Sequence, residues 1–280
     1  MKIIDGKALA KSIREKLKED VNQLKESGIN PKLAVILVGN NPASEVYVRN
    51  KAKACEDIGV DFELFRMSKE TTTDELLELV DTLNEDNNIN GILLQHPCDA
   101  DVDEGQAFER ISPLKDVDGF NPINVGRLNL GQDCLVSCTP YGVLRMLKSE
   151  NIDIEGKNVV ILGRSNIVGK PMAALMLKEN ATVTICHSKT KGLKNFAKEA
   201  DILIVAIGKA KFVTSDMIKD GAVVIDVGMN RDEGKLCGDV DFENVKDKAS
   251  YITPVPGGVG PMTIAMLMEN LVKAIKMQKM

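Results

Sequence analysis

Histidine and clustered cysteine are scarce in this sequence, and their scarcity excludes several kinds of site. Only two histidines occur in 280 residues, His96 and His187, so a three-histidine metal centre is excluded. A Ser-His-Asp triad would have to use one of them, and neither stands in a GxSxG setting. The six cysteines form no CxxC pair, which disfavours a zinc site and favours reduced thiols in a cytoplasmic protein. We therefore expect no metal.

A charge excess and long apolar runs are also missing. Lys and Arg total 36 against 41 Asp and Glu, a formal net charge of −5, and no basic cluster stands out. This balance argues against nucleic-acid binding, although a local pocket could still take an anionic substrate. No apolar run reaches membrane-spanning length, and the amino-terminal stretch MKIIDGKALAKSIREKL lacks the apolar core of a signal peptide. We expect no nucleic-acid or membrane partner.

Short apolar runs alternate with amphipathic stretches along nearly the whole chain. Runs typical of strands covered on both faces fall at 32–39, 62–68, 91–97, 158–163, 182–187, 201–208 and 222–229. Helical patterns fall at 7–27, 42–59, 73–87, 140–150 and 261–277. Thr72 and Glu75 have capping-box spacing, and Thr139 is expected to cap a helix that opens with Pro140. The alternation predicts an α/β protein with mainly parallel sheets.

The order of these elements predicts two domains. Residues 1–138 contain three strands and form an expected α/β substrate domain. Residues 139–260 form a βαβαβ series, an expected Rossmann-like parallel sheet. The segment 111–138, rich in Pro, Gly and Asn, is expected to be a connecting loop, and residues 261–280 are expected to pack back on the first domain.

The stretch GRSNIVGKP at 163–171 lies between a predicted strand and a predicted helix, the setting of a phosphate-binding loop. A Walker loop has four residues between its glycines and a hydroxyl residue after its lysine, whereas here there are five and Pro171 follows Lys170. The GxGxxG pattern matches only at Gly163, but the order of strand, loop and helix fits dinucleotide binding, with a pyrophosphate on the helix's free amides. An ordinary βα turn is the alternative.

The end of the following strand distinguishes the two nicotinamide dinucleotides. NAD-binding folds place an Asp or Glu about 20 residues after the loop. Here the strand ends in CHSK at 186–189, with no acid. Ser188, Lys189 and Arg164 would instead accept a 2′-phosphate, which the Arg164 guanidinium could bind bidentately. The sequence therefore favours NADP.

Polar residues of the first half suggest a substrate site. Tyr47 and Lys51 share a helix face, with Ser44 a turn earlier. A Tyr-xxx-Lys pair also marks short-chain dehydrogenases, but there it follows the dinucleotide loop, whereas here it comes before. Gln95 closes a strand and Asp118 lies in KDVDGFNP, although both could be purely structural.

Nine stretches of the sequence, taken in order, resemble one family over nearly the whole chain. They are YVRNK, GILLQHP, KDVDGFNP, CTPYGVL, GRSNIVGKPM, ATVTICHSKT, VIDVGMNR, GDVDF and ITPVPGGVGPMTIAML. The family is that of the bifunctional methylenetetrahydrofolate dehydrogenase/methenyltetrahydrofolate cyclohydrolases. The resemblance implies a two-domain homodimer with a folate cleft between the domains, which oxidises 5,10-methylenetetrahydrofolate with NADP and hydrolyses the methenyl product to 10-formyltetrahydrofolate.

The resemblance also assigns roles to residues. It implies that Lys51 is the main catalytic residue, that Tyr47 orients the folate, that Gln95 hydrogen-bonds Lys51, and that Asp118 anchors the pterin. Two further sets fall at family binding positions: for the cofactor Gly163, Arg164, Ser165, Ser188 and Met229, and for the substrate Ser44, Tyr47, Asp118, Pro256, Gly257 and Gly258.

The sequence departs from the family pattern at two places. The family usually reads Gln-Leu-Pro-Leu where this chain has QHPC at 95–98, and Pro-Cys-Thr-Pro where it has SCTP at 137–140. Adjacent strand residues face opposite ways, so His96 is expected to point away from Gln95 as a structural histidine. Two other functions stay open at this point: an NADP-linked dehydrogenase of a small hydroxy acid, similar to shikimate dehydrogenases, and a non-catalytic NADP-binding regulator.

Overall fold

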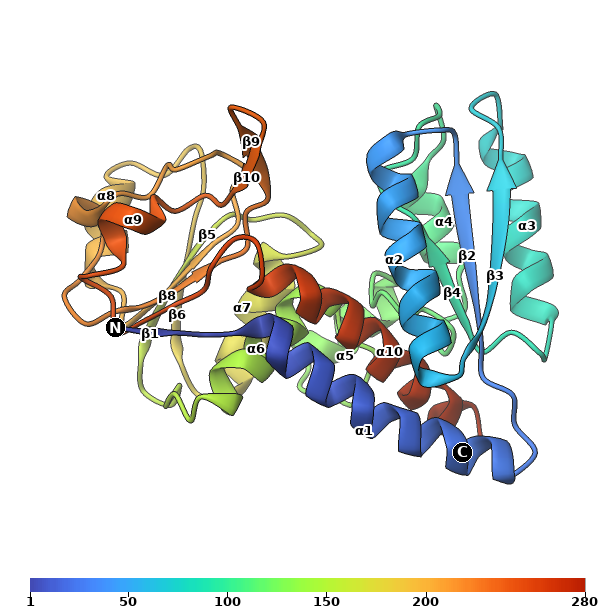
Figure 1. The fold of residues 1–280 in the computed structure, drawn as a ribbon. Helices are drawn as coiled ribbons and strands as arrows, with labels where there is room; N and C mark the ends of the chain where they lie inside the picture. Colours follow the sequence, from blue (N-terminus) through green and yellow to red (C-terminus); the bar gives the residue numbers. More distant parts are fainter. Residues whose placement is uncertain (280) are drawn as a thin grey trace. The chain divides into compact units, whose positions relative to one another are not determined.

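The computed structural model describes residues 1–279, which form two compact units, each built on a parallel sheet (Figure 1). The six-stranded unit comprises Met1–Ala10 and Thr139–Thr263, and the three-stranded unit comprises Lys11–Cys138 and the chain from Ile264 onward. The first ten residues therefore lie outside the unit that holds the rest of the expected 1–138 domain. The reason is that Lys2 and Ile3 form a strand of the larger sheet.

The elements follow the predicted alternation of strands and helices. The strands are β1 (Lys2–Ile3), β2 (Lys32–Val38), β3 (Asp61–Met67), β4 (Gly91–Leu94), β5 (Asn158–Leu162), β6 (Thr182–Cys186), β7 (Ile202–Val205), β8 (Val223–Asp226), β9 (Asn230–Asp232), β10 (Lys235–Cys237) and β11 (Tyr251–Ile252). The helices are α1 (Gly6–Glu26), α2 (Pro42–Ile58), α3 (Thr73–Glu85), α4 (Glu104–Arg110), α5 (Pro122–Asn129), α6 (Cys138–Ser149), α7 (Gly169–Lys178), α8 (Leu193–Glu199), α9 (Phe242–Val245) and α10 (Val259–Gln278), with a 3₁₀ turn at Ser215–Met217. Every predicted strand and helix is present.

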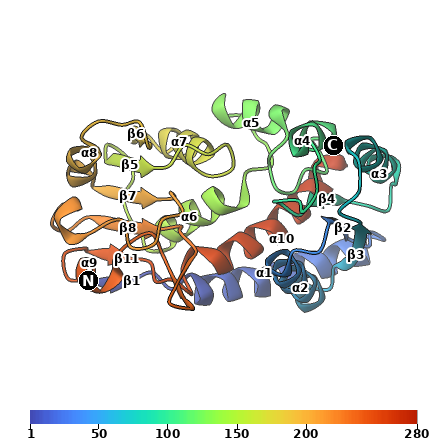
Figure 2. The ribbon, with the colours of Figure 1, turned by 90° about the horizontal axis from the view of Figure 1, so that it is seen from above.

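The three-stranded sheet has the order β3-β2-β4, with all strands parallel. Because side chains alternate along β2, Ala34 and Ile36 face one side, where they pack with Leu76 and Val80 of α3 and Ala107 of α4. Figure 2 shows α3 on one side of these strands and α2 on the other. Covering both faces explains why the β2 sequence is apolar throughout.

The six-stranded sheet has the order β1-β11-β8-β7-β5-β6, again all parallel. Val160, Leu203 and Val224 of its central strands share a buried cluster with Ala197 of α8 and Val245 of α9. Helices α8 and α9 thus cover one face of the sheet, and α7 contacts β5 and β6. The strand run and its helices can be followed in Figure 2.

Local signals account for most helix ends, with two corrections. Thr72 and Glu75 form the predicted capping box at the start of α3. Thr139 was expected to be an N-cap, but α6 already begins at Cys138, and the Thr139 hydroxyl lies 3.0 Å from the hydroxyl of Thr263. The expected loop at 111–138 contains a helix, α5, because Asn121 caps it and Pro122 opens it.

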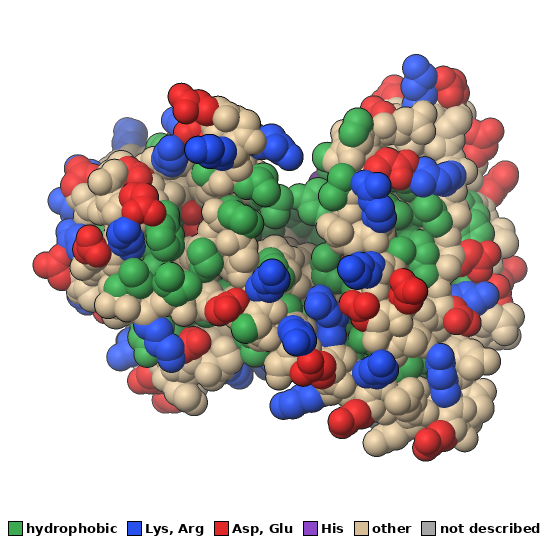
Figure 3. All heavy atoms as spheres, in the orientation of Figure 1, with side chains coloured by type: hydrophobic (Ala, Val, Ile, Leu, Met, Phe, Trp, Pro, Cys, Tyr) green, Lys and Arg blue, Asp and Glu red, His purple; other side chains and the backbone are tan. Residues whose placement is uncertain are grey.

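The distribution of charged side chains on the surface and the composition of the helices can be compared with the sequence. Acidic and basic side chains are interspersed over the face seen in Figure 3, without a region of one sign. None of the helices within residues 1–279 is long and apolar enough to cross a membrane.

Candidate active site

Helix α2 brings Lys51 to the end of strand β4. The Lys51 ammonium donates a hydrogen bond to Oε1 of Gln95 at 3.0 Å. Gln95 follows β4 directly and is 5% exposed, and its Nε2 donates to the backbone carbonyl of His96 at 2.9 Å. Both polar ends of the Gln95 amide therefore have partners, which fixes the face it presents to Lys51. The contact expected between Lys51 and Gln95 is present.

Burial shifts the pKa values of Lys51 and of the neighbouring Asp118. It lowers the pKa of Lys51, against the opposing influence of Asp118 and the thiols Cys138 and Cys55. Burial likewise raises the pKa of Asp118, while Lys51, the Cys138 thiol and His96 act to lower it. A lysine and a carboxylate thus share one partly buried site, where the lysine can lose its proton more readily than in water.

The two polar residues before Asp118 have structural roles that sequence reasoning missed. The Lys115 ammonium donates to the carbonyls of Leu83, Asn84 and Asp86 at the end of α3, at 2.8 to 3.0 Å. In the same motif, the buried Asp116 carboxylate accepts the backbone amides of residues 120 and 121, at 3.1 and 2.8 Å. These contacts hold the ends of the KDVDGF segment and so position Asp118 between them.

A side chain from the last helix also supports this segment. Nδ2 of the buried Asn270 donates to the backbone carbonyls of Val117 and Val136, both at 2.8 Å. Val117 directly precedes Asp118, and Val136 lies two residues before Cys138, so Asn270 holds the backbone beside both residues. The resemblance of ITPVPGGVGPMTIAML to the family ended short of Asn270, and no local pattern marked it.

The remaining predicted substrate residues lie in different surroundings. Ser44 is buried on α2, and Tyr47, one turn before Lys51, is 41% exposed. Pro256 and Gly257 belong to the six-stranded unit, in the turn before α10. There the Gly257 carbonyl accepts the amide of Lys7, and the neighbouring amide of Gly258 donates to Pro254.

The predicted cofactor loop turns sharply after β5. Gly163 has a φ of +127°, and a Cβ there would lie 2.2 Å from the carbonyl oxygen of Ala206. A Cβ on Gly169 would lie 2.2 Å from the carbonyl oxygen of Gly163 itself. Both positions therefore require glycine, because the loop folds back on its own backbone and on the end of β7.

The helix start beyond this loop differs from the expected anion site. Ser165 Oγ accepts the amides of Val168 at 3.1 Å and Gly169 at 3.4 Å, and the Ser165 carbonyl accepts the amide of Lys170 at 3.0 Å. The expectation that the first amides of α7 are free for a pyrophosphate is wrong for these three, because the loop satisfies them internally. The side chains of Arg164 and Ser165 remain exposed.

The other predicted cofactor positions also face solvent. Ser188 is exposed in the turn after β6, where the His187 amide donates to the Thr190 hydroxyl at 2.9 Å. Met229 follows β8 and is 49% exposed. Gly163, Ser188 and Met229 thus follow three strands of one parallel sheet, whose carboxyl ends share an edge.

Two buried carboxylates hold the loops at this edge, and sequence reasoning missed both. Asp239 accepts the successive amides of Ile207, Gly208 and Lys209 after β7, at 2.7 to 2.9 Å. Asp226 accepts the amide of Asp239 at 2.9 Å, and burial raises the pKa of Asp226 to about 6. The motifs VIDVGMNR and GDVDF are therefore parts of one hydrogen-bonded structure.

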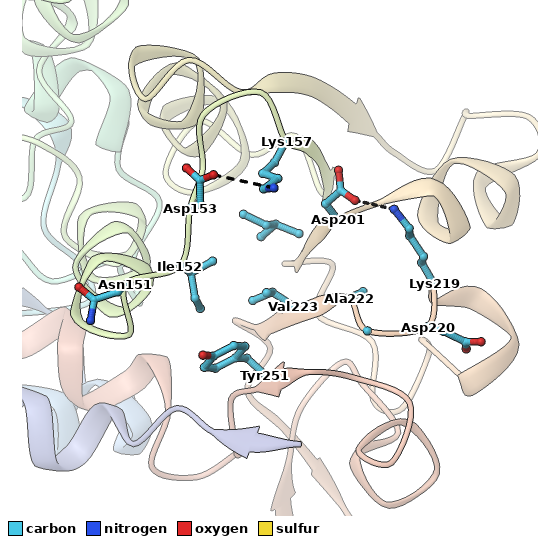
Figure 4. Close-up of a pocket in the computed structure, with 12 residues that line it drawn as sticks. Asn151, Ile152, Asp153, Lys157, Asp201, Lys219, Asp220, Ala222, Val223 and Tyr251 are labelled. Atoms are coloured by element: carbon cyan, nitrogen blue, oxygen red, sulfur yellow. Dashed lines mark hydrogen bonds and ion pairs between the residues drawn. The ribbon is translucent and has the colours of Figure 1, made fainter.

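A pocket of about 430 Å³ lies at the opposite, amino-terminal edge of this sheet (Figure 4). Its lysines are already paired with acids: Lys157 lies 3.9 Å from Asp153, and Lys219 lies 2.5 Å from Asp201. None of the predicted site residues lines it. Within residues 1–279, no group of His, Cys, Asp and Glu side chains could hold a metal ion.

Family models decide between the readings that the sequence left open. The tetrahydrofolate dehydrogenase/cyclohydrolase catalytic domain matches residues 4–118, and the NAD(P)-binding domain of the same family matches residues 137–279. The chain belongs to this family. Its membership decides against a hydroxy-acid dehydrogenase similar to shikimate dehydrogenases.

Individual relatives of this tetrahydrofolate dehydrogenase/cyclohydrolase agree over the full length. The bifunctional protein FolD of Halalkalibacterium halodurans is 59% identical over 274 residues, which cover 98% of each chain. The crystal structure of the Campylobacter jejuni enzyme FolD superposes with a TM-score of 0.97 at 53% identity, over 99% of each chain. The Trypanosoma brucei enzyme, solved with NADP cofactor and inhibitor, has a TM-score of 0.94 at 37% identity, over 99% of this chain and 98% of that one.

Proposed function

We propose that this chain oxidises 5,10-methylenetetrahydrofolate with NADP and hydrolyses the 5,10-methenyl product to 10-formyltetrahydrofolate. The observation that carries the proposal is the Lys51–Gln95 hydrogen bond of 3.0 Å, which lies inside the stretch matched to the family's catalytic domain. A lysine that is held in place and has a lowered pKa is the group that hydrolysis requires.

Lys51 acts on the proton of the attacking water. The methenyl substrate is a cation, so a neighbouring ammonium is disfavoured and the neutral amine is favoured further, in addition to the effect of burial. A neutral amine accepts the proton that water loses as it attacks the one-carbon unit. Gln95 orients this amine by accepting one of its N–H groups.

Asp118 anchors the pterin ring in this proposal. A pterin presents an amino group and a ring N–H on one edge, and a carboxylate can accept both. The carboxylate is held by the supported segment around Asp116 and faces the same site as Lys51. Tyr47, one turn before Lys51, orients the folate, and Ser44 of the same helix completes the substrate contacts of this unit. Pro256, Gly257 and Gly258 are further proposed substrate-binding residues.

The six-stranded unit holds the cofactor. The turn at Gly163 packs the loop closely against the end of β7, and the exposed polar side chains that follow it fit a dinucleotide. When bound, NADP supplies the hydride acceptor. Arg164, Ser165 and Ser188 offer exposed polar groups for its phosphates. Met229 follows β8, which is separated from β5 by β7 in the sheet.

The assembly and the location are further proposals. We infer a homodimer and a cytoplasmic protein, the latter supported by six cysteines that are all free thiols in the described structure. Size-exclusion chromatography with light scattering tests the dimer.

One assay tests the activity. The protein is mixed with 5,10-methylenetetrahydrofolate and NADP, and the absorbance of the methenyl compound is followed as it forms and then decays. The expected result is formation above the no-enzyme control, followed by decay faster than the spontaneous reaction. No formation would contradict the dehydrogenase, and decay at the spontaneous rate would contradict the cyclohydrolase alone.

A further inference from the structure

A single carboxylate, that of Glu104, holds the turn that follows β4. Its Oε1 accepts the backbone N–H of Cys98 at 2.5 Å, and its Oε2 pairs with Nδ1 of His96. Glu104 is the first residue of α4, whose start is capped by Asp103. The His96 ring also contacts Phe108 of the same helix edge-on, with centroids 6.2 Å apart. The turn is therefore held to α4 through the side chain of His96 and the backbone amide of Cys98.

The same turn carries the acceptor that orients Gln95. The backbone carbonyl of His96 accepts Nε2–H of Gln95, and Oε1 of that amide accepts the hydrogen bond of Lys51. A primary amide carries its donor and its acceptor on opposite sides, so the His96 carbonyl decides which atom of Gln95 faces the lysine. A continuous series of contacts thus runs from Glu104 through the turn to Lys51.

We propose that Glu104 and His96 are positioning residues for the hydrolysis step, acting on Lys51 through Gln95. The inference rests on the proposed roles of Lys51 and Gln95. When Glu104 no longer holds the turn, the His96 carbonyl is free to move, the Gln95 amide can rotate, and the lysine loses its oriented acceptor. The family pattern has leucine where this chain has His96, and a leucine side chain could not pair with the Glu104 carboxylate.

Three substitutions remove the contacts in steps. Glu104→Ala removes both and should lower kcat for methenyl hydrolysis about tenfold or more, since a misplacement of about 1 Å can cost ~100-fold. Glu104→Gln keeps an oxygen for the Cys98 amide and should lose less, as should His96→Leu, which keeps the amide contact intact. The dehydrogenase should fall less than hydrolysis in all three, because hydride transfer does not require Lys51 to accept a proton from water.

The matched control is Glu109→Gln, which removes an exposed carboxylate from the same helix and should leave both reactions at native rates. Loss of both reactions in equal proportion, in Glu104→Gln and His96→Leu alike, would mean that Glu104 only supports the fold. Native hydrolysis in Glu104→Ala would overturn the inference directly.

A double-mutant cycle with Gln95→Met separates this inference from the proposed function. If Glu104 acts through Gln95, Glu104→Gln should cost little more once Gln95 is gone. Hydrolysis is followed at high enzyme concentration and corrected for the spontaneous rate, so that the slow Gln95→Met variants can be measured. Equal losses in both backgrounds would overturn the positioning role alone. Native hydrolysis by Gln95→Met would instead remove the proposed role of Gln95, and the connection from Glu104 with it.

Discussion

The lysine site and the glycine loop, one in each unit, are built in opposite ways. Around Lys51, partly or fully buried side chains hold one another, and burial moves the pKa values of Lys51 and Asp118. At the glycine loop the shape comes from close backbone contact at Gly163, and the polar side chain of Arg164 is exposed. The difference follows from where the reactive group comes from. Hydrolysis needs a protein group of adjusted basicity, whereas hydride transfer needs only that the cofactor be held.

The largest effect should come from removing the adjusted amine. Lys51→Met keeps the side-chain length but should lower the rate of methenyl hydrolysis by ~10²–10⁴-fold, the usual size of acid–base assistance. Lys51→Arg should not restore it, because a guanidinium stays protonated. The dehydrogenase should fall less. Decay of methenyl absorbance, corrected for the spontaneous reaction, measures the effect.

The control for this prediction is Lys53→Met, which removes an exposed lysine from the same helix and should have no effect. Native hydrolysis by Lys51→Met would show that the catalytic role lies elsewhere, and the contrast between the two sites would no longer hold.

A smaller effect is expected at the glycine loop, and only with one cofactor. Arg164→Ala should raise KM for NADP by about one to two orders of magnitude, since a charge-assisted hydrogen bond is worth ~1.5–3 kcal/mol. KM for NAD should hardly change, because NAD lacks the 2′-phosphate. Initial rates with each cofactor measure the difference, with Lys198→Ala as a control for loss of one exposed positive charge in the same unit. Equal losses with both cofactors would place Arg164 on a shared part of the dinucleotide.

A third substitution should affect the lysine site without touching the cofactor. Asp118→Asn keeps the shape of the side chain but loses its charge, so folate binding should weaken roughly fivefold, the difference of about 1 kcal/mol between charged and neutral hydrogen bonds. Titration calorimetry with NADP should give the native affinity. A parallel loss of NADP affinity would point to misfolding of the segment around Asp116 instead.

The sequence predicted the elements well because their signals are local. Apolar runs covered on both faces mark β2 and β5, and the capping box of Thr72 marks the start of α3. The two-residue strand β1 is too short to show a pattern, and only its pairing with β11 reveals it. The first amides of α7 were misjudged because the hydroxyl and carbonyl of Ser165 fold back on them, a geometry that glycine spacing does not encode.

The site was predictable only as far as the family motifs reached. Lys51 and Gln95 are 44 residues apart, and the resemblance, not spacing, suggested that they meet. Asp116, Asp239 and Asn270 were missed because each binds backbone groups whose positions depend on tertiary folding. The sequence alone does not show whether the carboxylate of an acid in a family motif faces a ligand or a backbone amide.

The smallest expected effect tests whether the charges of the lysine site act on one another. Hydrolysis needs the neutral amine, so its rate should rise with pH through the pKa of Lys51 and then level off. Burial lowers that pKa, and the Asp118 carboxylate partly opposes the change. Removing the negative charge with Asp118→Asn should therefore lower the pKa of Lys51 further and move the rising part of the pH–rate profile to lower pH. The profile is measured as kcat at saturating methenyl substrate, so that weaker folate binding does not enter.

Asp57→Asn is the matched control for this shift, since it removes an exposed carboxylate from α2 and should leave the profile in place. Movement of the Asp118→Asn profile to higher pH would contradict the assigned sign of the interaction. An unmoved profile would mean that Asp118 carries no charge in the pH range where Lys51 titrates. Asp118 would then be protonated in that range, because burial raises its pKa. The pterin would be anchored by a carboxylic acid that donates one hydrogen bond instead of accepting two.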